Sequence, residues 1–158
     1  MGKDKDKKKK KVKKPRIRAL ALGIFRQDDY IFVSEGYDAA LEKIFYRPIG
    51  GAIEFGEHGS AAVWREVYEE LGLSIEVRGF LGALENIFTY ESQPGHEIVL
   101  LYATHFVDEA CNALSYVAEG HDDNSALYTA RWMPIDFFRN GGAPLYPDGL
   151  IALLDKPL

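Results

Sequence analysis

The chain has a single cysteine, Cys111, and this scarcity excludes an intrachain disulfide. It also lacks an uninterrupted apolar stretch of the roughly 20 residues that a helix needs to cross a bilayer. Its basic start is followed by strand-like alternation, whereas a signal peptide would continue with an apolar run. The lone cysteine fits a reducing compartment, and the other two absences argue against membrane insertion and secretion, so we predict a cytoplasmic protein without a membrane span.

Acidic and apolar residues are scarce in the first 14 positions, MGKDKDKKKKKVKK, where nine lysines face two aspartates. Such a self-repelling, low-complexity segment cannot bury enough apolar surface to fold, so we expect residues 1–14 to form a disordered tail. The plainer interpretation is a solubilising tail. The alternative is RNA binding, because clustered lysines release counterions from phosphates. A charge run alone carries no specificity, which favours the first interpretation.

Residues 15–158 suffice for one domain, and 47% of the whole chain is hydrophobic. Alternating apolar residues bounded by turn formers predict strands over residues 16–26, 30–35, 44–46, 74–89, 96–107 and 127–133. A helix is expected after residue 60 and a short one around 148–154. Strands and helices do not alternate regularly, which favours a mixed sheet with helices packed on it.

Turn-forming residues separate the expected strands. Pro48 and the Gly50-Gly51 pair are expected to break regular structure, and residues 92–95 to form the turn between two long strands. Residues 108–125 are expected to be an irregular or partly helical surface segment.

The helix expected after Ser60, its N-cap, should end at Gly72. At about 3.6 residues a turn, one arc of this helix carries only apolar residues, namely Val63, Val67, Leu71, Trp64 and Tyr68. The opposite arc carries the charged residues Arg65, Glu66, Glu69 and Glu70. The pattern predicts a helix anchored by the whole apolar arc that presents all its charges on the other side.

Three carboxylates, those of Glu66, Glu69 and Glu70, are neighbours at helical spacing. One interpretation is an exposed charged face, softened by Arg65. The other is a site for Mg²⁺ or Mn²⁺, because these hard cations prefer carboxylate oxygens and would remove the repulsion. Mg²⁺ commonly bridges to substrate phosphates, so this second interpretation indicates phosphate chemistry.

The spacing of the glycine and charged residues around this helix favours the metal-site interpretation. From Gly51, five residues lead to Glu57, and seven more lead to REVYEELGL at residues 65–73. This segment, Gly51 to Leu73, resembles the complete Nudix box. The resemblance implies an α/β fold, a Nudix-type α/β/α sandwich with a mixed sheet over residues 15–158. It also implies hydrolysis of a pyrophosphate bond in a nucleotide or nucleoside diphosphate derivative, with Mg²⁺ or Mn²⁺ as cofactor.

The resemblance assigns roles to residues that match the box. Glu69 and Glu70 match metal ligands, and Glu66 matches a ligand or the base that activates water. Gly50 matches a carbonyl ligand, Glu57 a ligand or orienting group, and Arg65 a residue that holds the carboxylates in place.

Some relatives recruit a further acid from a later loop. Glu119, Asp122 and Asp123 are the candidates here, and Glu119 is the first choice. Each of the three also fits an ordinary acidic loop.

The sequence does not identify the substrate. Phe88, Tyr90 and Trp132 are candidates to stack on a base, although core packing is the commoner role of such residues. Two alternatives to nucleotide hydrolysis remain: a hydrolase of RNA 5′ ends, suggested by the lysines, and a nucleotide-binding regulatory module without catalysis. Nudix relatives include dimers, so the resemblance also leaves a homodimer open.

Overall fold

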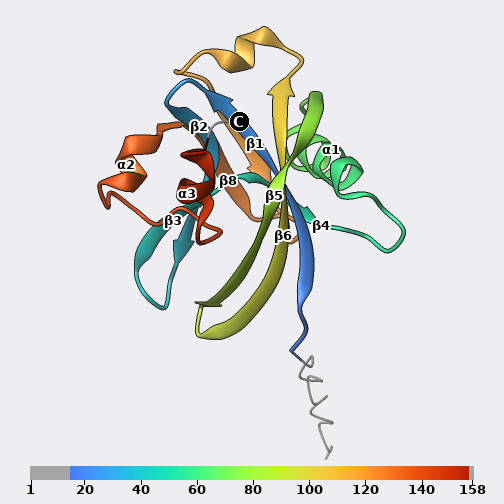
Figure 1. The fold of residues 1–158 in the computed structure, drawn as a ribbon. Helices are drawn as coiled ribbons and strands as arrows, with labels where there is room; N and C mark the ends of the chain where they lie inside the picture. Colours follow the sequence, from blue (N-terminus) through green and yellow to red (C-terminus); the bar gives the residue numbers. More distant parts are fainter. Residues whose placement is uncertain (1–14, 157–158) are drawn as a thin grey trace, which may run out of the picture.

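The computed structural model describes residues 15–156, which form a mixed β-sheet between helices (Figure 1). The strands are β1 (Arg18–Gln27), β2 (Tyr30–Asp38), β3 (Lys43–Arg47), β4 (Ile49–Ala52), β5 (Ile75–Tyr90), β6 (Gln93–Phe106), β7 (Val117–His121) and β8 (Leu127–Pro134). The helices are α1 (Gly59–Leu71), α2 (Ile135–Arg139), α3 (Leu150–Leu154) and the short 3-10 helix η1 (Glu109–Asn112). None of the helices in residues 15–156 is long and apolar enough to span a bilayer.

The first strand lies at the centre of the sheet. The strand order is β5-β6-β1-β2-β8-β7, with β3 paired to β2 and β4 paired to β1. β1 runs parallel to β6 and antiparallel to β2 and β4, so the sheet is mixed as the sequence predicts. The sequence of β1, RALALGIFRQ, is a nearly continuous apolar run because the strand is buried on both faces.

Successive residues of β1 point to two separate cores. Leu20, Leu22 and Ile24 pack with residues of α2 and α3 on one face of the sheet. Ala21 and Phe25 pack with residues of α1 on the other face. Figure 1 shows α1 on one side of the sheet and α2 and α3 on the other. The predicted α/β/α arrangement is therefore confirmed.

The Gly50-Gly51 pair does not break regular structure as predicted, because it forms the middle of β4 and pairs with Ala21 and Leu22 of β1. Gly50 has a φ of 142°, and a Cβ there would lie 2.2 Å from the carbonyl oxygen of Ala21. Only glycine fits this close approach of two strands.

The predicted boundaries also shift elsewhere. The turn between β5 and β6 is formed by Glu91 and Ser92, both with positive φ, and residues 93–95 already belong to β6. Two such residues in the left-handed region give the twist that a two-residue hairpin needs. The segment expected to be irregular, 108–125, contains η1 and also the strand β7, and α2 was not predicted.

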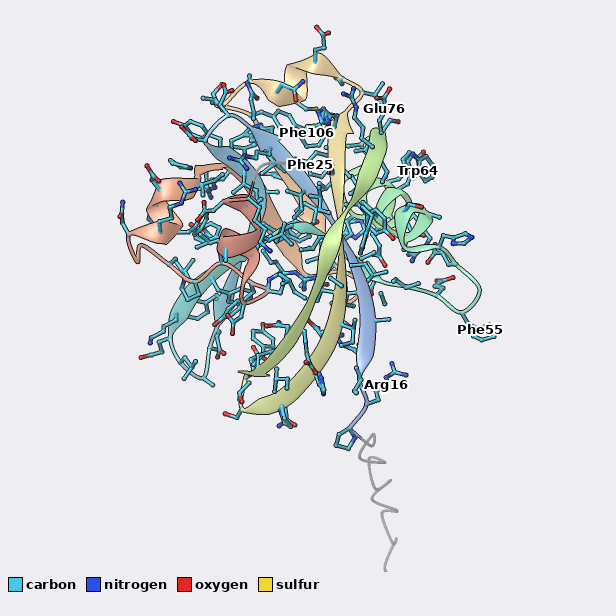
Figure 2. All side chains as sticks on the ribbon, in the orientation of Figure 1. Arg16, Phe25, Phe55, Trp64, Glu76 and Phe106 are labelled. Atoms are coloured by element: carbon cyan, nitrogen blue, oxygen red, sulfur yellow. The ribbon has the colours of Figure 1, made fainter. Side chains whose placement is uncertain are left out.

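The helix α1 ends at Gly72 as predicted, with a φ of 67°. It begins at Gly59 after His58, so Ser60 is not its N-cap but lies in the first turn. The prediction that the whole apolar arc is buried is wrong for Trp64 and Tyr68, which are 46% and 52% exposed. Their rings stack on each other at 5.4 Å, and Figure 2 shows Trp64 projecting outward while Phe25 and Phe106 lie inside.

The buried face of α1 contains Glu66 together with four small or aliphatic residues, namely Gly59, Ala62, Val63 and Val67. The small residues allow the helix to approach the sheet closely on this side. The helix is consequently turned about its axis so that one of its carboxylates faces the sheet. The predicted tail and its RNA-binding interpretation concern residues outside the described range.

Candidate active site

Three carboxylates from two distant segments meet beside α1. Glu66 and Glu70 lie one turn apart on the helix, and Asp123 belongs to the loop between β7 and β8. Each offers an oxygen, and these oxygens all lie within 4.8 Å of one another. Such a set of hard oxygen donors fits Mg²⁺ or Mn²⁺ and would otherwise repel itself.

Glu66 is 3% exposed and lies against β4. A Cβ at Gly51 would lie 2.5 Å from the carboxylate carbon of Glu66, so the glycine supplies the space that this carboxylate fills. Burial raises the pKa of Glu66, and the hydrogen bond donated by Nη1 of Arg65 at 3.0 Å opposes this shift.

Glu70 accepts a hydrogen bond of 2.6 Å from the hydroxyl of Tyr128 in β8. Burial raises the pKa of Glu70 to about 7, the Tyr128 hydrogen bond opposes the shift, and the charge of Glu66 adds to it. Burial and the bond to Glu70 in turn raise the pKa of Tyr128 above its ordinary value. The charged form of Glu70 is therefore only partly compensated, and a bound cation would stabilise it further.

Arg65 holds the loop before α1 to the helix. Its Nε and Nη2 donate to the two carboxylate oxygens of Glu57 at 2.8 and 2.9 Å, and Nη2 also donates to the carbonyl oxygen of Ala52 at 2.9 Å. This fork lowers the pKa of Glu57 to about 2. Glu57 therefore lies against Arg65 in this structure, which matches the predicted orienting role more closely than that of a ligand.

The other predicted residues are placed as follows. The side chain of Glu69 is 55% exposed and accepts a hydrogen bond of 3.1 Å from Arg65. Gly50 lines the same cavity as Glu70. Glu119 is exposed on β7 and, among residues 15–156, is not part of the carboxylate cluster, whereas Asp123 is. The choice of Glu119 thus stays a prediction that the geometry does not favour.

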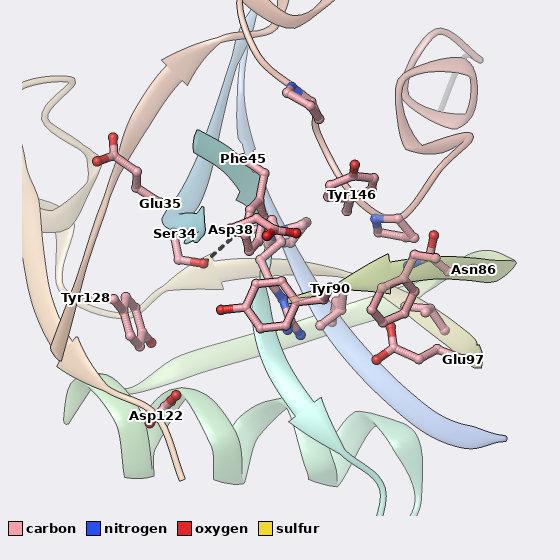
Figure 3. A pocket seen from close by; sticks show the side chains of 18 of the residues that line it. Ser34, Glu35, Asp38, Phe45, Asn86, Tyr90, Glu97, Asp122, Tyr128 and Tyr146 are labelled. Atoms are coloured by element: carbon pink, nitrogen blue, oxygen red, sulfur yellow. Dashed lines mark hydrogen bonds between the residues drawn. The ribbon is translucent and has the colours of Figure 1, made fainter. Parts of the chain in front are cut away.

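A cavity of about 460 Å³ is lined by Glu70 and by residues of β3, β5 and β6 (Figure 3). Phe88 and Tyr90 line it, as expected of substrate-binding residues. Trp132 does not: it is buried among Phe32 and Phe106, and its Nε1 donates to the carbonyl oxygen of Cys111 at 2.8 Å. Its position is that of a core residue.

Sequence reasoning missed several residues of the cavity, namely Arg18, Phe45, Arg47, Asn86, Glu97, Tyr128 and Tyr146. Most of them lie within predicted strands. Alternation assigns each side chain to one face of the sheet, but it does not show whether that face lines a cavity.

The sequence matches the model of the NUDIX domain over residues 14–149. No curated protein matches the chain. Among solved structures, a NUDIX hydrolase from Nitrosomonas europaea is 20% identical, with a TM-score of 0.62 over 90% of this chain and 87% of that one.

Two further structures have the same fold. A MutT NUDIX hydrolase from Burkholderia pseudomallei is 20% identical, with a TM-score of 0.54 over 90% of this chain and 99% of that one. An ADP-ribose pyrophosphatase from Streptococcus suis is 17% identical, with a TM-score of 0.54 over 86% and 87%. Since the domain match covers most of the sequence and the carboxylates of the box meet beside a cavity, the chain belongs to the Nudix family.

Proposed function

We propose that this protein is a metal-dependent hydrolase that cleaves a pyrophosphate bond in a nucleotide or nucleoside diphosphate derivative. The observation that carries the proposal is the position of Glu70, which belongs to the carboxylate cluster and also lines the cavity. A cation held there would lie beside a space large enough for a nucleotide. The names of the structural neighbours, which include an ADP-ribose pyrophosphatase, support the same reaction class.

Glu66, Glu70 and Asp123 would hold the cation. Glu69, which precedes Glu70 on the helix, would be a further ligand on turning away from Arg65. When bound, Mg²⁺ or Mn²⁺ neutralises charge on the phosphates and lowers the pKa of a bound water. Glu66, which lies within the cluster, would also accept the proton of the attacking water. The water oxygen bonds to phosphorus as the bridging P–O bond breaks, and no covalent protein intermediate is needed.

Other side chains position these groups. Tyr128 fixes the orientation of the Glu70 carboxylate through its hydrogen bond. Arg65 ties Glu66, Glu69 and the loop residue Glu57 together. Arg47 lines the cavity close enough to lower the pKa of Glu70 by its charge, a position from which it can contact substrate phosphates.

Hydrolysis of a substrate panel tests the proposal. The panel contains nucleoside triphosphates, oxidised nucleotides, diadenosine polyphosphates, ADP-ribose, NADH, nucleotide sugars and capped RNA, each with Mg²⁺, Mn²⁺ or chelator. We expect metal-dependent cleavage concentrated on one class, and none from the Glu70→Gln variant. If the folded protein binds nucleotides but cleaves none of the substrates, it is a regulatory binding module and the enzyme hypothesis is wrong.

A further inference from the structure

We propose that a polar row formed by Arg18, Glu97 and Asn86 binds the base of the nucleotide at the end of the cavity away from the carboxylate cluster. This inference rests on the proposed function, because it takes the ligand to be a nucleotide. Figure 3 shows Asn86 and Glu97 at one end of the cavity, Tyr128 and Asp122 at the other, and Tyr90 between them.

The three residues are direct neighbours across three strands. Glu97 in β6 is the register partner of Asn86 in β5 and of Arg18 in β1. Residues paired in this way project to the same face of a sheet. All three line the cavity, where Asn86 is 4% exposed and Glu97 is 5% exposed. The far wall of the cavity thus carries a buried amide beside a buried carboxylate.

Both buried groups keep hydrogen-bonding capacity. Glu97 bonds to Arg18 through Oε1, and Asn86 accepts a bond of 3.3 Å from the backbone N–H of Asp148 through Oδ1. Within residues 15–156, no hydrogen bond was found for Oε2 of Glu97 or Nδ2 of Asn86. Neither atom is among the fully buried, unpartnered side-chain atoms of residues 15–156, so both are open to the cavity, where a ligand can bond to them.

Asp38 provides a contrast within the same cavity. It is equally buried, but it accepts hydrogen bonds from the backbone N–H groups of Ala40, Leu41 and Glu91. Its carboxylate therefore has a structural role in joining the β2–β3 turn to the β5–β6 hairpin. Glu97 and Asn86 have no comparable set of backbone partners.

The free groups define the chemistry of the ligand. An acceptor on Glu97 beside a donor on Asn86 matches an edge that offers a donor next to an acceptor, as nucleobases do. The charge of Arg18 is paired with that of Glu97, so this end of the cavity carries no net positive charge to hold a phosphate. The cationic Arg47 lies instead near Glu70, so the charges order the ligand with its phosphates toward the cluster.

Aromatic rings line the space between the two ends. The ring of Phe88 lies over Gly95, where a Cβ would come within 2.3 Å of it, and the ring of Phe45 lies over Gly36 in the same way at 2.4 Å. Phe45 also makes edge contacts of 5.8 Å with Tyr90 and with Tyr146. Rings held in fixed positions offer stacking surfaces to a flat heterocycle, which a sugar alone would not use.

Titration calorimetry in the presence of chelator tests the row without requiring hydrolysis. The ligands are AMP, GMP, CMP, UMP and ribose 5-phosphate, which has the same phosphate and sugar but no base. We expect at least one mononucleotide to bind more tightly than ribose 5-phosphate. Glu97→Gln and Asn86→Asp should each weaken that mononucleotide at least tenfold and leave ribose 5-phosphate unchanged.

Glu85→Gln is the matched control, because Glu85 precedes Asn86 in β5 but is exposed and does not line the cavity. If Glu97→Gln does not fold, Asn86→Asp decides alone. The proposal is overturned if no mononucleotide binds more tightly than ribose 5-phosphate, or if the folded variants bind like the wild type. Base-dependent binding without any hydrolysis would instead overturn the proposed function and leave the row in place.

Discussion

At the level of single residues, the buried carboxylate of Glu66 depends on the absence of a side chain at Gly51. The glycine was recognised in the sequence as part of a motif, and the structure gives the physical reason for it. A methyl group there would meet all three atoms of the Glu66 carboxylate within 2.6 Å. The position of the proposed base is therefore set by a neighbouring strand as much as by its own helix.

Gly51→Ala should lower kcat/KM by about 100-fold, because a displacement of about 1 Å in a reacting group can have that effect. Gly79→Ala is the control, since nothing lies within 4 Å of a Cβ at that position. Steady-state hydrolysis of the best substrate from the panel measures both. Equal activities for the two variants would contradict the dependence of Glu66 on Gly51.

For the two candidate acids, Asp123 in the loop after β7 and Glu119 on β7, we expect opposite results. Asp123→Asn should lower kcat/KM by about tenfold or more, as expected when a charged group is lost near a metal. Glu119→Gln should stay within about twofold of the wild type, because surface substitutions are usually mild. Titration with Mn²⁺ gives a second readout, in which only Asp123→Asn should weaken binding. A larger effect of Glu119→Gln would restore the choice made from the sequence.

At the level of secondary structure elements, α1 shows where sequence periodicity stops being informative. Its existence and its end at Gly72 could be predicted, because period and glycine position are local properties. Its rotation could not, because five apolar residues span an arc wider than the contact with the sheet. The contact centres on the small residues and Glu66, which leaves Trp64 and Tyr68 at the exposed edge.

This rotation predicts unequal costs for substitutions along the apolar arc. Val67→Ala should lower the free energy of unfolding by about 2 kcal/mol, because a fully buried side chain is truncated. Tyr68→Ala should cost less than about 1 kcal/mol, chiefly the lost stacking on Trp64. Urea denaturation measures both values. A larger loss for Tyr68→Ala would mean that the aromatic pair is covered in solution.

The strands also divide into those that the sequence predicts and one that it does not. Most could be predicted from alternation, but β7 could not, because its buried positions are Ala118 and Gly120, which carry little apolar signal. A Cβ at Gly120 would lie 2.5 Å from the side chain of Leu71, so small residues here mark close packing on α1. The packing of β7 also brings the following loop, with Asp123, to the cluster. β7 was therefore missed because its position depends on a tertiary contact without a local pattern, and Asp123, one of the three candidate acids, is placed by the same contact.

At the level of the whole molecule, the carboxylate cluster links stability to pH and metal. Without metal, folded Glu70 keeps its proton up to a pKa of about 7, well above the ordinary value that it has when unfolded. Between these two values the native state binds more protons than the unfolded chain, so its stability falls as the pH rises through this window.

We therefore expect the Tm in chelator to fall between about pH 5 and pH 7, and added Mn²⁺ to raise it most at the alkaline end. Differential scanning calorimetry at several pH values measures this. Glu70→Gln removes the titrating group, so its Tm should change less across the same window. An identical slope for the variant and the wild type would assign the pH dependence to other groups.

The parallel pairing of β1 with β6 also determines the order in which the parts of the fold can form. Arg18 and Glu97 are 79 positions apart, and β1 pairs with β6 along almost its whole length. Contacts between such distant segments form slowly, because the intervening chain must first be ordered. A nascent chain that ends at Leu73 contains the complete Nudix box but has no partner for the parallel edge of β1. Pairing at that edge therefore waits for synthesis of β6, and Asp123 joins the cluster later still.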